Sequence, residues 1–211
     1  MPKPEEKAVF TALKKFSDGV ASKMTTLTAG EPEDQIRGPF ETFMQEVGTA
    51  IFRPIVCTGE VRLADRLGKP DYAIHAGSLL AGYVELKAPG SGANPKRFKG
   101  HNRDQWKRFS AIPNLIYCDG NDWGLYRSGE AIGRVVRLSG DVSTDGAKAV
   151  RAKDAENLLG LLRDFLSWQP IIPTARSGEI DLKGLANLLA PLEKFLTPLV
   201  RLFTKPSAPT L

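Results

Sequence analysis

The chain has 211 residues, a net charge of +5 and a sequence pI of about 9.2. Apolar residues make up 42% and charged residues 25%, which excludes a disordered chain and is typical of a globular domain. No apolar run approaches the roughly 18 residues that a membrane span requires, and the N-terminus lacks the apolar core of a signal peptide. We therefore expect a soluble, cytoplasmic protein with one main domain, whose positive charge suits a polyanionic partner such as nucleic acid.

Two helices are expected before the first strand. The first covers residues 5–16, where apolar side chains recur at helical spacing. The second follows a polar stretch, and Glu33 and Asp34 supply the negative charge that a helix start favours. Gly38-Pro39 inside this segment predicts either a kink or a helix that begins at Pro39.

The middle of the chain alternates strands, turns and helices. A strand over residues 55–61 precedes two further strands that begin near Asp71 and Gly82, and a basic Gly/Pro/Asn-rich loop follows over residues 88–99. After the loop we expect a helix over 101–110, strands over 114–118, 123–127 and 132–138, a polar loop over 141–150, and an amphipathic helix over 152–168.

The last part of the chain is expected to form a separate element. Residues 169–179 contain two prolines and are interpreted as a linker, and residues 180–211 as a leucine-rich helical extension interrupted by Pro191 and Pro198. The element order predicts an α/β fold over residues 1–168, with a central mixed sheet flanked by helices and its core at residues 33–168.

The most informative stretch is a predicted hairpin with charged residues on one face. Side chains alternate along a strand, so Glu85 and Lys87 share one face while Val84 and Leu86 point to the other, where they can join the core. An antiparallel partner strand would bring Asp71 close to Glu85. Two carboxylates beside an ammonium group favour a site for a hard divalent cation.

Magnesium fits such a site, with manganese as a substitute, because both ions accept oxygen ligands. We expect Asp71, Glu85 and the backbone carbonyl of Leu86 to bind the metal, and Lys87 to orient water or stabilise developing charge. Glu41 on the preceding helix is a further candidate, although Asp34 or Glu46 could take its part. Gln105 is expected to bind a phosphate or the lysine.

Basic residues gather near the predicted site, and a solvated surface is the simplest explanation of such a cluster. Their position beside two carboxylates favours contacts with DNA phosphates instead. The residues predicted to contact DNA are Arg37, Lys96, Arg97, Lys99, His101, Arg103 and Arg108.

Together these segments resemble a known family. The pattern Pro70-Asp71 followed by Glu85-Leu86-Lys87 is similar to the signature of the PD-(D/E)XK nucleases. The surrounding sequence resembles the N-terminal nuclease domain of single-chain restriction–modification enzymes, in which an N6-adenine methyltransferase follows. The likeness covers residues 33–168 and includes Arg37-Gly38-Pro39-Phe40-Glu41, Gly82-Tyr83-Val84-Glu85-Leu86-Lys87-Ala88-Pro89-Gly90, Asp104-Gln105-Trp106 and Asp119-Gly120-Asn121-Asp122-Trp123-Gly124.

The resemblance implies a restriction-endonuclease-like core and magnesium-dependent cleavage of double-stranded DNA, with the metal held by Asp71 and Glu85. It also implies methyltransferase or specificity domains as partners, since the chain contains no Asn-Pro-Pro-Tyr motif of its own. One site cuts one strand, so cleavage of both strands requires dimerisation or two successive nicks. Two alternatives remain open: a repair or junction-resolving nuclease with the same site, and a catalytically silent DNA-binding module.

Overall fold

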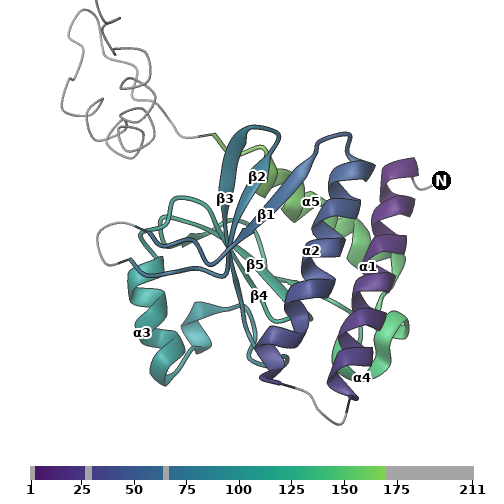
Figure 1. The fold of residues 1–211 in the computed structure, drawn as a ribbon, viewed down its shortest axis with the longest axis horizontal. Helices are drawn as coiled ribbons and strands as arrows, with labels where there is room; N and C mark the ends of the chain where they lie inside the picture. Colours follow the sequence, from purple (N-terminus) through teal and green to yellow (C-terminus); the bar gives the residue numbers. More distant parts are fainter. Residues whose placement is uncertain (1–2, 27–29, 64–66, 170–211) are drawn as a thin grey trace, which may run out of the picture. The chain divides into compact units, whose positions relative to one another are not determined.

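The computed structural model describes residues 3–26, 30–63 and 67–169. Residues Met1–Gln169 belong to one compact unit, whose described part is an α/β fold with an open mixed sheet flanked by helices (Figure 1). This arrangement confirms the predicted fold class and is consistent with a restriction-endonuclease-like core. Apart from Gln169, the predicted linker and helical extension lie outside the described residues.

The sheet runs in the order β1 to β5 along the chain. Its strands are β1 (Ile55–Gly59), β2 (Tyr72–Ala76), β3 (Leu79–Leu86), β4 (Leu115–Cys118) and β5 (Asp122–Arg127). Neighbouring strands are antiparallel except β3 and β4, which are parallel. Two short strands, β6 (Glu130–Ala131) and β7 (Val136–Arg137), also pair with β5.

Helices cover both faces of the sheet. On one side lie α1 (Pro4–Met24), α2 (Pro32–Ala50) and α5 (Ala152–Leu166), and on the other lies α3 (Gly100–Phe109) (Figure 1). The larger core is on the first side, where Trp123 of β5 packs with ring centroids 5.7 to 6.0 Å from Phe16, Phe40 and Phe43. Because these side chains are fully buried, truncating Trp123 to alanine would cost about 3–5 kcal/mol.

The two long helices differ from the prediction. Helix α1 continues past Phe16 to Met24, because its apolar spacing extends to the fully buried Val20. Helix α2 begins at Pro32 and passes through Pro39 without ending. Gly19 of α1 leaves room for the ring of Pro39, because a Cβ built on Gly19 would lie only 3.3 Å from Pro39 Cγ.

Three other segments also depart from the prediction. The first strand ends at Gly59 because Glu60 adopts a positive φ of 55°. Of the strand expected over residues 132–138 only β7 forms, since Gly133 turns the chain at a φ of 71°, and β6 lies just before that range. The expected loop over residues 141–150 contains α4 (Val142–Asp145), which the Asp141 side chain caps, and a 3-10 turn over Gly146–Ala149. None of the helices in the described ranges is long and apolar enough to cross a membrane.

Candidate metal centre

Strands β2 and β3 bring two acidic residues together. Their antiparallel register pairs Tyr72 with Val84, so Asp71, immediately before β2, lies opposite Glu85. Asp71 is 8% exposed, and Glu85 and Lys87 are 3% exposed each. The predicted alternation is confirmed, because Val84 and Leu86 belong to the large core while the charged side chains lie outside it. Carboxylates this deeply buried require compensation by cations or hydrogen-bond donors.

A third carboxylate comes from the start of α2. Oxygen atoms of Glu33, Asp71 and Glu85 all lie within 4.8 Å of one another. Glu33 was expected only as a favourable charge at a helix start, and its position here depends on how α2 packs against the sheet. A hard divalent cation prefers such a set of three oxygen donors.

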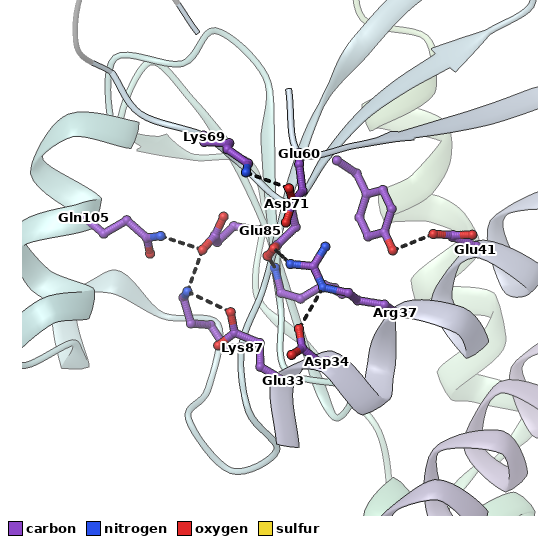
Figure 2. A network of polar contacts seen from close by, with 12 residues as sticks. Glu33, Asp34, Arg37, Glu41, Glu60, Lys69, Asp71, Glu85, Lys87 and Gln105 are labelled. Atoms are coloured by element: carbon purple, nitrogen blue, oxygen red, sulfur yellow. Dashed lines mark hydrogen bonds and ion pairs between the residues drawn. The ribbon is translucent and has the colours of Figure 1, made fainter. Parts of the chain in front are cut away.

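Glu41 is not brought to this cluster, contrary to the prediction. It stands two turns further along α2, where its Oε1 accepts a hydrogen bond of 2.7 Å from the Tyr72 hydroxyl (Figure 2). Asp34 lies near the cluster but pairs with Arg37 at 3.1 Å, and Glu46 pairs with Lys15 on α1 at 2.7 Å. Of the acidic residues on this helix, Glu33 alone joins the described cluster.

Two cations compensate the three carboxylates (Figure 2). The Lys87 ammonium lies 2.6 Å from Glu85 Oε1 and 3.8 Å from Glu33 Oε1. The Arg37 guanidinium pairs with Asp71, so this predicted DNA contact faces an acidic partner in the protein. Asp71 is further oriented by the Leu86 N–H, which donates a 2.8 Å hydrogen bond to its Oδ2. The predicted role of the Leu86 carbonyl as a metal ligand stays a prediction.

Helix α3 closes the other side of the site. Gln105 Nε2 donates a 2.6 Å hydrogen bond to Glu85 Oε1, which places this predicted residue in the cluster. Three buried side-chain atoms in the described residues have no hydrogen-bond partner: Glu85 Oε2, Gln105 Oε1 and Tyr117 Oη. Glu85 and Tyr117 are paired positions of β3 and β4, so their side chains share one face of the sheet. Unpaired buried polar atoms are rare and indicate a place for a further ligand.

Burial and mutual repulsion make the carboxylates harder to ionise. The pKa of Glu85 rises to about 7, mainly because of burial and also because of repulsion by Asp71, and the contacts with Lys87 and Gln105 limit the rise. Burial likewise raises the pKa of Asp71 and of Glu33. Because additional positive charge would favour the ionised forms, the cluster is electrostatically prepared to receive a cation.

The remaining predicted DNA contacts lie on the chain between β3 and the end of α3. Lys96 and Arg97 belong to a 3-10 turn over Pro95–Arg97, and Lys99 immediately precedes α3. The other three, His101, Arg103 and Arg108, are on α3, and all six are exposed. Within the described part of the chain, none of the six forms an ion pair with a carboxylate, which leaves their charges available to a partner.

No protein-family model and no curated protein sequence matches the chain. Among solved structures, the cryoEM structure of a DrdV–DNA complex is similar over 76% of the chain, with a TM-score of 0.51 and 18% sequence identity. The likeness is one of fold. The matched region spans 14% of that protein chain.

Proposed function

We propose that this chain is a magnesium-dependent DNA endonuclease domain of the PD-(D/E)XK type, acting within a restriction–modification enzyme. The observation that carries the proposal is the convergence of Glu33, Asp71 and Glu85 around one point, with Lys87 in contact with Glu85. The fold shared with a protein solved in complex with DNA supports it, as do the unpaired basic residues along α3.

The three carboxylates fit a divalent cation. They supply oxygen donors within 4.8 Å of one another, and the buried Glu85 Oε2 has no partner in the protein. Asp71 and Glu85 would hold the ion, with Glu33 as a direct or water-mediated third ligand. A bound Mg²⁺ ion would supply Lewis acidity and neutralise charge on the phosphate, and Mn²⁺ would substitute for it.

The residues around the carboxylates have separate roles. Lys87, which contacts Glu85 at 2.6 Å, would orient the attacking water and stabilise negative charge on the phosphate in the transition state. Gln105 holds the Glu85 carboxylate in position through its amide N–H. Arg37 neutralises Asp71 and, once a cation takes over that role, becomes free to contact a DNA phosphate.

Partners beyond double-stranded DNA are part of the proposal. The chain matches a small share of a much longer protein, so we propose that methyltransferase and specificity domains act together with it. Cutting both strands would then require a second copy or two successive nicks, because a single site hydrolyses one bond at a time.

Cleavage of supercoiled plasmid DNA tests the proposal. Asp71→Asn keeps the acceptor for the Leu86 N–H, and Lys87→Gln keeps much of the side-chain length, so both variants should fold. We expect magnesium-dependent nicking to fall by about a hundredfold or more in each. Glu41→Gln is the matched control and should cleave normally. Unchanged nicking in both Asp71→Asn and Lys87→Gln would refute the assignment.

A further inference from the structure

A polar pocket lies outside the candidate metal centre and shares no lining residue with it. It encloses about 330 Å³ between the loop that follows β3 and the strand β7. Gly90, three residues after Lys87, belongs to the wall of the pocket, which also includes Arg97 from the 3-10 turn and Arg137 from β7. The proposed catalytic role does not use this pocket, and the sequence pattern identified only Arg97 among its lining residues.

The loop that forms the pocket wall is held in a fixed conformation. Asp119, which is 1% exposed, accepts a 2.7 Å hydrogen bond from the Gly92 N–H. The Tyr126 hydroxyl donates a 2.6 Å hydrogen bond to the Ala93 carbonyl. Gly124 allows this close approach, since a Cβ there would lie 2.7 Å from the Ala93 oxygen. The pocket is therefore preorganised, which reduces the entropy lost when a ligand binds.

One of the two guanidinium groups is braced by a buried acid. Asp122 is 5% exposed, and both its oxygens accept hydrogen bonds of 2.6 Å from Arg137 Nε and Nη2. This pairing neutralises Asp122 and fixes the plane of the guanidinium, whose remaining N–H groups are available because the side chain is 66% exposed. Asp122 therefore fixes the orientation of Arg137, and the remaining N–H groups of Arg137 can bind a ligand.

The second guanidinium has no acidic partner. Arg97 is exposed and forms no ion pair within the residues that the structure describes. The lining side chains thus include two guanidinium groups and one carboxylate, and that carboxylate is paired with Arg137. Planar, multiply donating groups around a preorganised polar cavity match the geometry of a phosphate group.

We propose that this pocket is a phosphate subsite, which binds a backbone phosphate of the DNA strand that the metal centre is proposed to cut. Arg97 is its main donor, and Arg137, held by Asp122, is the second. This inference rests on the proposed function for its choice of ligand, and it gives a role to residues that lie outside the metal centre.

Fluorescence anisotropy with a labelled DNA duplex, in EDTA so that no cleavage occurs, tests the subsite across a series of salt concentrations. Arg97→Ala removes no ion pair and should fold normally. We expect its affinity to fall about fivefold and its salt dependence to lose about one unit of slope, as for one phosphate contact. Lys7→Ala removes one exposed charge near the N-terminal end of α1 and should bind DNA like the wild type.

Arg137→Gln is the second variant, and its melting temperature is measured alongside because it leaves Asp122 without its partner. A folded Arg137→Gln protein with weakened duplex binding supports the subsite. If Arg97→Ala binds the duplex with wild-type affinity and salt slope, the subsite is refuted. The nuclease assignment is then untouched, because plasmid cleavage tests it separately. Weakened binding by Arg97→Ala in a protein that never cleaves would instead refute the nuclease and keep the subsite.

A free phosphate is the other source of the same chemistry. Inorganic phosphate is added in a thermal-shift assay to the wild type and to Arg97→Ala. Inorganic phosphate is also added to the anisotropy assay. If it competes with the duplex for the wild type but not for Arg97→Ala, the result supports a strand phosphate in the pocket. Stabilisation by phosphate that Arg97→Ala loses while its duplex affinity stays normal would mean that the pocket takes a free phosphate, and would overturn the strand assignment.

Discussion

Two buried acidic pairs lie at the same end of the sheet, where the parallel strands β3 and β4 finish, and they are compensated in opposite ways. Asp119 accepts three backbone N–H groups, and Asp122 is saturated by the guanidinium of Arg137. Asp71 instead accepts one backbone N–H, from Leu86, and pairs with Arg37, while Glu85 contacts the side chains of Lys87 and Gln105.

The difference also appears in what is left unpaired. Glu85 Oε2 has no partner, whereas no carboxylate oxygen of Asp119 or Asp122 is orphaned in the described residues. Each carboxylate oxygen of the first pair therefore has a partner within the protein, whereas Glu85 keeps one buried oxygen that can bind a ligand. The comparison separates an acidic pair that supports the structure from one prepared for chemistry.

The largest effect on stability is expected at the first pair. Asp119→Ala would strand the N–H groups of Gly92, Asn121 and Asp122, each buried or partly buried, and should cost about 3–5 kcal/mol of unfolding free energy. Urea denaturation measures it. Asp104→Ala, at an exposed pair with Lys107, is the control and should leave the unfolding free energy close to that of the wild type. A similar loss in both variants would remove the distinction between the pairs.

The second prediction concerns pH in the absence of metal. The pKa of Glu85 rises from 4.5 to about 7, so between these values the folded protein holds more protons than the unfolded chain. Its stability should therefore fall as pH increases through this window, by up to roughly 3 kcal/mol. Melting temperatures in EDTA across the window measure the slope. Glu85→Gln should flatten it, and a stability that increases with pH would contradict the predicted sign.

The third prediction distinguishes two glutamates on α2. Glu33→Gln should weaken Mn²⁺ binding about tenfold, as for the loss of one charged or water-mediated ligand. Glu41→Gln, eight residues further along the helix, should bind Mn²⁺ normally because the Glu41 carboxylate accepts a hydrogen bond from Tyr72 and lies outside the cluster. Titration followed by the paramagnetic signal of free Mn²⁺ compares them. The reverse pattern would restore the assignment of Glu41 to the site.

The smallest effect is expected at two buried tyrosines. Tyr117→Phe removes a hydroxyl without a partner and should change the unfolding free energy by less than about 0.5 kcal/mol. Tyr126→Phe removes the hydroxyl that donates to the Ala93 carbonyl and should cost about 1–2 kcal/mol. Equal costs, measured by urea denaturation, would mean that the Tyr117 hydroxyl is satisfied after all.

The hairpin was predictable from the sequence because it depends on local rules. Alternation along β3 sets the faces of Glu85 and Lys87, and the antiparallel return brings Asp71 opposite. Glu33 was not predictable in the same way, because the choice among four acidic residues on α2 depends on where the helix meets the sheet. Glu33, Arg37 and Glu41 recur every four residues, a signal for one shared face but not for which member reaches the site.

The second acidic pair was overlooked for a related reason. Asp119 and Asp122 flank Gly120-Asn121, a combination typical of a turn between the strands predicted over residues 114–118 and 123–127. Its role in fixing the loop after β3 depends on a hydrogen bond to Gly92, 27 residues away along the chain. Likewise, the interruption at Gly133 depends on a positive φ that an apolar run does not reveal.

The central claim is that the acidic pair Asp71 and Glu85 binds a divalent cation together with Glu33, and calorimetric titration with Mn²⁺ tests it most directly. We expect the wild type to bind Mn²⁺ and Asp71→Asn, which keeps the hydrogen bond from Leu86, to lose that binding while remaining folded. Equal Mn²⁺ binding by the wild type and Asp71→Asn, or none by the folded wild type, would contradict the account.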